Sequence, residues 1–346
     1  MSETYYSRKS QLSIPESLDY LKIIPSYQCG RDCFYCYNTA LEQNCVVSNN
    51  GIFITLQDIL QNQKQGFSAE ILGGEPLHKN TIDTTKALLR ILGGNKYCNR
   101  RIVATAISSS RIIQNIAEQI DFLYLSFDIS PSSRNKKKLD LKKIEYIRYA
   151  CAEKNAELAL SIVLYGDETE DQLVEFVEQA HLLGIRFLAF GYIGFHESTA
   201  LCIEKYTDIF YCLFVLRYAF EDNILISGDI LDTLDFAVRG LKRKRICHCG
   251  ETSTVILPDG NLAPSICFGE GKKAFQIEYL RRKLERMRIL ELSDCSDCGL
   301  WEACKGGCMG AAVSRTGDHL NRDDVFCVLL RSVWEKIIHD RTKVFK

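Results

Sequence analysis

The sequence predicts an α/β fold in which six strand–helix units form a parallel sheet, either a partial, TIM-like (β/α)6 barrel or an open sheet, followed by a cysteine-rich region. Between Leu21 and Phe195, short continuous apolar runs alternate with longer amphipathic stretches, which is typical of buried parallel strands joined by helices. After Phe195 this alternation fades, and eight of the 16 cysteines crowd the last third of the chain. With 46% hydrophobic residues, a chain of 346 residues can form one large core.

Each expected strand is an apolar run bounded by Gly, Pro, Ser or Asp. The strands are Leu21–Pro25, Ala69–Leu72, Arg101–Ala106, Phe122–Phe127, Leu158–Leu164 and Arg186–Gly191. The helices between them are Leu56–Gln65, Ile82–Leu92, Ile112–Gln119, Leu141–Asn155 and Glu170–Leu183, and Gly184 ends the last one. This order implies a parallel sheet with right-handed crossovers, either partly closed as a barrel or open and doubly wound. In both cases the reactive groups are expected beyond the carboxyl ends of the strands.

The composition argues against nucleic acid or a membrane as a partner. The formal net charge is −1, and the basic runs Lys136–Lys138 and Lys242–Arg245 are local enough to be solvated faces. The first residues show no signal peptide, and the apolar stretch Ile209–Phe220 is interrupted by Arg217 and too short to span a bilayer. We therefore expect a cytoplasmic protein, in which cysteines indicate metal rather than disulfides.

The most informative motif is Cys29-Gly-Arg-Asp-Cys33-Phe-Tyr-Cys36, directly after the first expected strand. It supplies three thiolates, whereas a cubane iron–sulfur cluster has four irons to ligate. One iron is then open to a ligand that is not protein. Such a vacancy suits catalysis, while a full set of protein ligands suits structure or electron transfer.

A second motif, Gly73-Gly74-Glu75-Pro76, follows the second expected strand. Glycines at a strand end allow close approach of a ligand to the backbone, and a carboxylate there can pair with an ammonium group. Taken alone, the run is an ordinary turn signal. Because this run follows the strand that comes next after the cysteine motif, a role in ligand binding is favoured over a simple turn.

Together these two motifs resemble those of the radical S-adenosylmethionine (SAM) superfamily, and the resemblance covers residues 20–195. It implies that Cys29, Cys33 and Cys36 ligate a catalytic [4Fe–4S] cluster whose open iron binds SAM. The cluster then reductively cleaves SAM to a 5′-deoxyadenosyl radical that abstracts a substrate hydrogen. The cofactor-binding residues implied are Tyr35, Gly73, Gly74, Glu75, Pro76, Ser126, Asp128 and Arg134. Ser126-Phe127-Asp128 matches a Ser-x-Asp-Gly element except for Ile129, and a strand-end cap is the alternative for Ser126.

The last third resembles the SPASM extension of this superfamily, which holds two auxiliary [4Fe–4S] clusters. The resemblance implies one cluster on Cys247, Cys249, Cys267 and Cys308, and a second on Cys295, Cys298, Cys304 and Cys327. Either Cys247 or Cys249 fits the first position of the family pattern, and the loop from Gly260 to Cys267 is longer than usual. Structural zinc is the alternative, because paired Cys-x-x-Cys sets often hold it. The expected organisation is an N-terminal extension (1–19), a radical SAM core (20–195), a helical bridge (196–245), a SPASM domain (246–330) and a C-terminal helix (331–346).

Proteins with this layout mostly modify peptides, so the resemblance implies an oxidoreductase that oxidises or cross-links a side chain of a ribosomally made peptide or protein. An implied partner is an electron donor such as flavodoxin or ferredoxin. About twenty residues precede the first strand, too few for a leader-binding domain, so a leader would be recognised by a separate leader-binding protein or by the barrel's own surface. Phe268 stands where anaerobic sulfatase maturases have aspartate, which argues against formylglycine formation. The alternatives are a radical SAM dehydrogenase acting on a small molecule, and a non-catalytic iron–sulfur or zinc protein.

Overall fold

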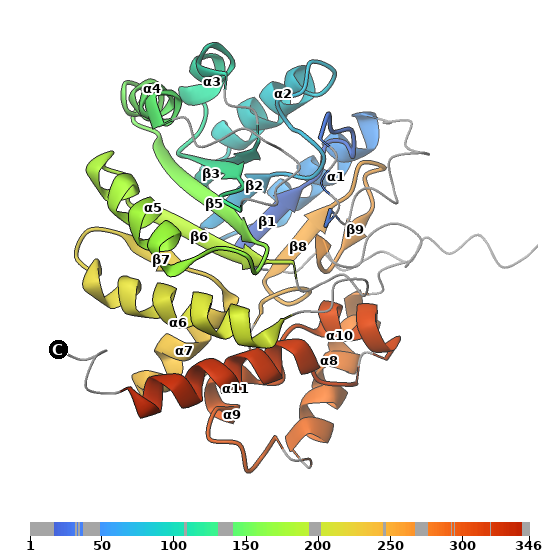
Figure 1. Ribbon diagram of the computed structural model, residues 1–346. Coiled ribbons are helices and arrows are strands. Elements are labelled where there is room, and N and C mark those ends of the chain that lie inside the picture. Colours follow the sequence, from blue (N-terminus) through green and yellow to red (C-terminus); the bar gives the residue numbers. More distant parts are fainter. Residues whose placement is uncertain are drawn as a thin grey trace, which may run out of the picture.

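A single nine-stranded sheet runs through the centre of the computed structural model (Figure 1). The structure describes residues 17–31, 33, 35–36, 49–106, 109–130, 141–193, 202–244, 247–266, 276–291, 293, 295–318 and 320–340. The strand order is β7-β6-β5-β4-β3-β2-β1-β8-β9, and every neighbouring pair is parallel except β8 and β9. The strands are β1 (Tyr20–Ile23), β2 (Phe67–Ile71), β3 (Cys98–Thr105), β4 (Phe122–Phe127), β5 (Glu157–Leu164), β6 (Phe187–Tyr192), β7 (Leu225–Ser227), β8 (Ser253–Ile256) and β9 (Leu262–Ala263). The predicted α/β class with a parallel sheet is confirmed.

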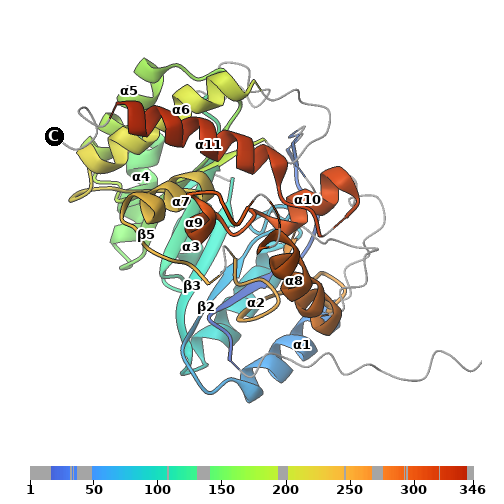
Figure 2. The same cartoon turned by 90° about the horizontal axis from the view of Figure 1, so that it is seen from below.

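The helices follow the strands in alternation and then collect in the C-terminal part. They are α1 (Asn49–Asn62), α2 (Ile82–Gly93), α3 (Ser110–Ala117), α4 (Leu141–Ala152), α5 (Glu170–Leu182), α6 (Ile203–Ala219), α7 (Asp229–Val238), α8 (Gln276–Glu291), α9 (Trp301–Cys304), α10 (Met309–Thr316) and α11 (Asp324–His339). Helices α1 to α5 surround the outer side of the sheet, whereas α8 to α11 gather together on the opposite side (Figures 1 and 2). The cysteine-rich segment thus lies beside the barrel-like part of the chain.

The ends of α5 show how the sequence determines an element locally. Thr169 accepts a hydrogen bond from the N–H of Gln172, whose side chain accepts in return from the Thr169 N–H, which completes a capping box. At the other end Gly184 has φ +69°, and Ile185 donates its N–H to the carbonyl of Ala180. This left-handed turn satisfies the last carbonyls, so the expected helix stop at Gly184 is confirmed.

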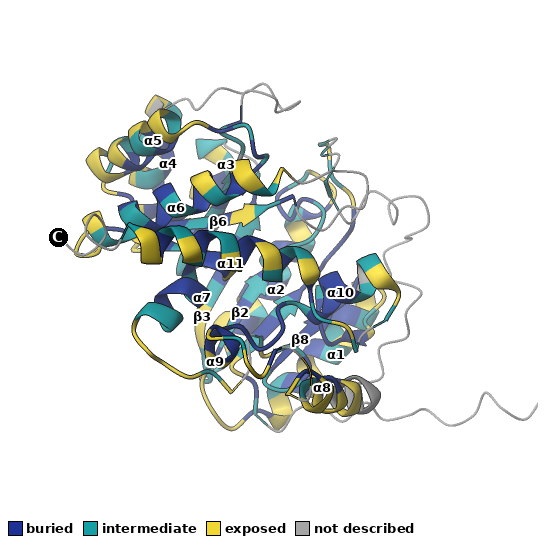
Figure 3. Ribbon diagram, turned by 60° about the horizontal axis from the view of Figure 1, so that its bottom comes forward, coloured by how far each residue is buried: buried dark blue, intermediate teal, exposed yellow. Residues whose placement is uncertain are grey.

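The segment between the barrel-like part and the cysteine-rich part contains a strand as well as helices. Helices α6 and α7 lie within the predicted bridge of residues 196–245, but β7 lies between them and pairs with β6. The sequence prediction missed β7 because its three residues are too few for an apolar period to be detected. Helix α6 packs against α11, and both turn buried residues toward the interior and exposed ones outward (Figure 3).

The core lies between the sheet and its covering helices. Ile23 and Val103 are both register partners of Ile71, and all three side chains are fully buried. Such layers fix the strand order and hence which loops meet at the carboxyl ends of the strands. Within the described ranges, every helix is too short or too polar to cross a lipid bilayer.

Candidate active site

The cysteine motif lies in the loop that follows β1, at the carboxyl end of the parallel strands. Cys29, Cys33 and Cys36 are half-buried, and the N–H of Cys36 donates to the carbonyl of Cys33 at 2.9 Å. Burial raises the pKa of the Cys29 thiol, and the nearby charges of Glu75, Cys33 and Cys36 raise it further. The three thiols are therefore electrostatic neighbours in one loop, which fits a cluster held by three cysteines.

The Gly73–Pro76 turn packs directly on the segment that leads into this loop. Gly73 has φ +93°, and a Cβ atom on Gly74 would lie only 2.3 Å from the carbonyl oxygen of Gln28. The N–H of Glu75 donates to that same carbonyl at 2.7 Å. Only glycine permits this close contact, so the turn sets the position of Gln28 and of its neighbour Cys29.

The Glu75 carboxylate is buried and anchors the turn to the end of β3. It accepts hydrogen bonds from the Thr105 hydroxyl at 2.5 Å, the Ala106 N–H at 2.8 Å and the Leu77 N–H at 3.0 Å. A carboxylate offers about four acceptor positions, and donors from the described residues fill three of them, which leaves one for a ligand such as an ammonium group. The donors Thr105 and Ala106 were not predicted, although both belong to the expected third strand and lie at its carboxyl end.

A second group of side chains joins the cysteine loop to β4 and β5. The hydroxyl of Tyr35 donates to Asp128 at 3.0 Å, and that of Tyr165 donates to the other oxygen of Asp128 at 3.2 Å. The two rings meet edge to face, with centroids 5.6 Å apart. Burial, followed by the charge of Asp128, raises the pKa of Tyr35, so its phenol stays protonated and remains a donor. Tyr165 was not predicted, because only the fold brings the end of β5 beside the cysteine loop.

Ser126 and Arg134 are the other two residues predicted to contact the nucleoside. Ser126 is half-buried on β4, where it is the register partner of Ser161 on β5. Arg134 lies outside the described residues.

A cavity of about 580 Å³ opens beside Cys29 and Glu75. Its lining comes from the cysteine loop, the turn after β2, the end of β3 and helix α4: Cys29, Gly30, Arg31, Glu75, His78, Ala106, Ser109, Ser110, Lys143 and Tyr146. His78, which was not predicted as a site residue, belongs to this lining. The cavity carries positive charge from Arg31 and Lys143 next to the predicted cluster ligands.

In the C-terminal part, Cys295, Cys298, Cys304 and Cys327 lie together. Burial raises the pKa of Cys304 to about 11, and the charges of Cys327 and Cys298 add to the increase. Burial likewise raises the pKa of Cys327, and Cys295 and Cys298 are among its charged neighbours. These four are the residues predicted to hold the second auxiliary cluster.

Helix α8 holds the loop that connects Cys304 to Cys308. Lys305, Gly306 and Gly307 all have positive φ, at 49°, 81° and 71°. The guanidinium of buried Arg286 donates to the carbonyls of Gly306 at 2.5 Å and Gly307 at 3.3 Å, and to that of Asn321 at 2.8 Å. Arg286 was not predicted, since no local pattern distinguishes it from its neighbours on α8.

The predicted ligands of the first auxiliary cluster are only partly described. Cys247 and Cys249 lie close together, and a hydrogen bond from the Cys249 thiol to Cys247, together with burial, raises the pKa of Cys249. Lys283 on α8 donates to the carbonyl of Cys247 at 2.7 Å and lies 3.9 Å from its sulfur. Cys308 precedes α10, while Cys267 lies outside the described residues. Over the described part of the chain, no three His, Cys, Asp or Glu side chains converge on a site for a single metal ion.

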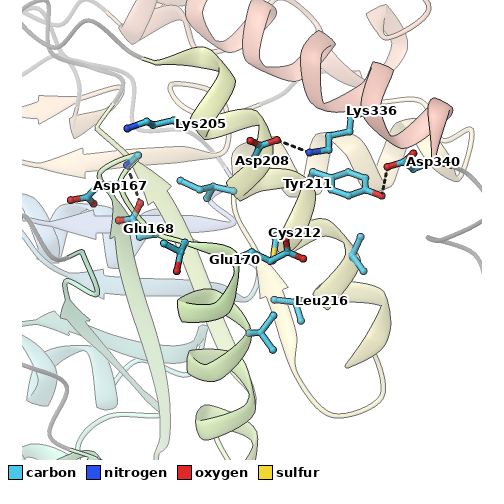
Figure 4. A pocket seen from close by; sticks show the side chains of 15 residues that line it. Asp167, Glu168, Glu170, Lys205, Asp208, Tyr211, Cys212, Leu216, Lys336 and Asp340 are labelled. Atoms are coloured by element: carbon cyan, nitrogen blue, oxygen red, sulfur yellow. Dashed lines mark hydrogen bonds and ion pairs between the residues drawn. The ribbon is translucent and has the colours of Figure 1, made fainter.

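A larger cavity, of about 760 Å³, is lined by none of the predicted cluster ligands and lies between the start of α5, α6 and α11 (Figure 4). Its walls include an ion pair between Lys336 and Asp208 at 2.5 Å and a hydrogen bond from Tyr211 to Asp340 at 3.1 Å. These two contacts join α11 to α6. They hold the helix that carries Cys327 against the barrel-like part.

Comparisons with known proteins agree with this geometry. No protein-family model matches the chain. The chain is 21% identical to the radical SAM cyclopropyl synthase TigE of Paramaledivibacter caminithermalis, over 98% of this chain and 78% of that protein. Among solved structures it resembles anSMEcpe bound to AdoMet and a peptide (TM-score 0.67, 18% identity, 94% and 98% of the two chains). It also resembles Streptococcus suis SuiB bound to S-adenosylmethionine (TM-score 0.61, 19% identity, 91% and 78%). The predicted fold and the predicted resemblance to radical SAM enzymes are thereby confirmed.

Proposed function

We propose that this chain is a radical SAM oxidoreductase with SPASM-type auxiliary clusters that oxidises or cross-links a side chain of a ribosomally made peptide or protein. The observation that carries the proposal is the packing of the Gly73–Pro76 turn on the loop of Cys29, Cys33 and Cys36. Two motifs that lie some forty residues apart in the sequence meet at the carboxyl ends of β1 and β2, where parallel sheets bind their ligands.

Each residue of the site has a role in holding the cofactors. Cys29, Cys33 and Cys36 would ligate a [4Fe–4S] cluster, which when bound supplies the electron for reductive cleavage of SAM. The turn that Glu75 anchors would receive the methionyl ammonium group. Tyr35 would lie beside the adenine, held by its hydrogen bond to Asp128. Ser126 and Arg134 would contact the nucleoside.

The C-terminal thiols would hold two auxiliary [4Fe–4S] clusters. The mutual proximity of Cys295, Cys298, Cys304 and Cys327 supports the second of them. The pair Cys247 and Cys249, together with Cys267 and Cys308, would hold the first. Cys295 and Cys304 are buried, which favours a second cluster that exchanges electrons with a bound substrate while excluding bulk water.

The peptide substrate is supported by the relatives. TigE is named as a cyclopropyl synthase, anSMEcpe was solved with a bound peptide, and SuiB was solved with its precursor peptide SuiA. An electron donor such as flavodoxin or ferredoxin would reduce the catalytic cluster, and a separate leader-binding protein would present the peptide. The basic residues Arg31 and Lys143 beside Cys29 suit an acidic donor.

The test is anaerobic reconstitution with iron and sulfide, followed by reduction in the presence of SAM. Wild-type protein should contain iron for three clusters and release 5′-deoxyadenosine. Cys33→Ala should release none but keep its auxiliary iron, whereas Cys298→Ala should still cleave SAM without forming product. Cys202→Ala, at an exposed thiol outside all three sets, is the matched control and should behave as wild type.

Other outcomes separate the alternatives. Wild-type protein without SAM cleavage would refute the proposal. Iron for only two clusters, with cleavage intact, would favour an enzyme of the same mechanism that acts on a small molecule.

A further inference from the structure

Helix α8 carries two buried cations on one face. Lys283 and Arg286 are three residues apart, so their side chains leave the helix on the same side. Their exposed fractions are 9% and 3%, and charged side chains are rarely buried to this extent without partners. Arg286 donates to the carbonyls of the loop that leads into Cys308, whereas Lys283 donates to the turn of Cys247 and Cys249. One helix face therefore contacts both segments that carry these three predicted ligands of the first auxiliary cluster.

The ammonium group of Lys283 contacts the turn in more than one way. Its nitrogen donates to the carbonyl of Cys247 at 2.7 Å and to that of Cys249 at 3.5 Å. It also contacts the sulfur of Cys247 at 3.9 Å, the distance of a long N–H···S hydrogen bond. Glu251 forms an ion pair with the same nitrogen at 3.0 Å. Lys283 thus binds both the backbone of the turn and the sulfur of one predicted ligand.

These contacts have an electrostatic consequence for a cluster bound to the sulfur of Cys247. The reduction potential of an iron–sulfur cluster depends on the net charge around it and on hydrogen bonds to its sulfurs. Reduction adds a negative charge, which a nearby ammonium group stabilises, and burial limits the screening of that attraction by salt and water. The carboxylate of Glu251 cancels part of the ammonium charge. The two side chains should therefore move the potential in opposite directions.

We propose that Lys283 is a positioning residue of the first auxiliary cluster: it holds the turn of Cys247 and Cys249 and raises the reduction potential of a cluster bound to Cys247. Glu251 limits this increase by neutralising part of the charge of Lys283. The inference rests on the proposed function, because it needs a cluster on Cys247.

The experiment is a redox titration of the reconstituted full-length chain followed by electron paramagnetic resonance. Replacing the three cysteines of the N-terminal motif with alanine removes the catalytic signal, and the signal lost on a further Cys247→Ala change identifies the first auxiliary cluster. Lys283→Met removes the charge and the N–H donors, so it should shift the midpoint potential of that signal to more negative values. Lys283→Arg, which keeps both, should recover part of the shift. Glu251→Gln should shift the potential to more positive values, which a role of Lys283 in holding the turn alone would not produce.

Arg288→Met is the matched control, since it removes an equal charge from an exposed position on the same helix. It should leave the potential unchanged. An unchanged potential in Lys283→Met, with the cluster intact, would overturn the inference. If Lys283→Met loses the cluster, Glu251→Gln decides: a positive shift supports the inference and an unchanged potential overturns it.

Two outcomes of the same titration separate this inference from the proposed function. If Cys247→Ala removed no signal, the sulfur beside Lys283 would hold no cluster and the inference would fail, while the proposed function could stand on the other thiols. Absence of any auxiliary signal in wild-type protein would instead count against the proposed function.

Discussion

Gly74 is the position where the packing of the site is tightest, and Gly74→Ala is the most direct test of it. The added Cβ would lie 2.3 Å from the carbonyl oxygen of Gln28, 2.6 Å from the carbonyl carbon of Tyr27 and 2.8 Å from the carbonyl oxygen of Ser26. All three contacts are to backbone, so no flexible side chain can move aside. A displacement of about 1 Å is needed to restore ordinary van der Waals distances, and Cys29 must follow because it is the next residue after Gln28.

Two consequences follow from this displacement. Overpacking of a tight site costs about 1–3 kcal/mol of stability. A misplacement of about 1 Å near reacting groups can lower a rate on the order of 10²-fold. We therefore expect Gly74→Ala to fold with a lowered melting temperature, and to release 5′-deoxyadenosine on the order of 10²-fold more slowly than wild type.

The assay combines anaerobic iron analysis, thermal unfolding and the rate of 5′-deoxyadenosine release. Gly94→Ala is the control, since Gly94 ends α2 with negative φ and its added Cβ would meet neighbours only at 3.6 Å. That variant should match wild type in both iron content and rate. If Gly74→Ala also matched wild type, the turn would not set the position of Cys29 and the reasoning would be refuted.

Three further predictions test other contacts of the structure. Thr105→Val removes one of the three donors to the buried Glu75 carboxylate and should cost about 1–3 kcal/mol, measured by urea unfolding of the metal-free chain; an unchanged midpoint would show that the hydroxyl is not needed. Arg286→Met leaves three loop carbonyls without their donor, so it should lower the free energy of unfolding by about 3 kcal/mol and cause loss of auxiliary iron. Retained iron would show that Arg286 is not needed to hold the loop. Tyr165→Phe removes one donor to Asp128 and should weaken SAM binding several-fold in equilibrium dialysis, while unchanged binding would mean that Tyr165 plays no part in holding Asp128.

The sequence predicted most of the barrel-like half because its strands are long enough to show a pattern. Strands β1 to β6 each overlap a predicted apolar run, and α5 starts at the predicted Glu170 and ends before the predicted stop at Gly184. The short strands β7, β8 and β9 were missed. They have two to four residues each. Pairing of β7 with β6, of β8 with β1 and of β9 with β8, rather than local sequence, makes them strands.

In the candidate site too, local features could be predicted from the sequence and contacts between distant strands could not. The spacing of Cys29, Cys33 and Cys36 is visible in the sequence because all three lie in one loop. The partners of Asp128 and Glu75 could not be found there, since Tyr165 and Thr105 come from other strands. Side chains on different strands meet only when the register of the sheet brings the strand ends together.

By itself, the sequence determined which chemistry the chain carries: the thiol spacings, the glycine turn and the order of strands and helices are local patterns. The tertiary structure decided what surrounds that chemistry. The carboxylate of Glu75 meets its donors, and the guanidinium of Arg286 meets the carbonyls of Gly306 and Gly307, because strand register and helix docking bring them together. Such contacts depend on the path of the whole chain, and no short stretch of sequence contains that path.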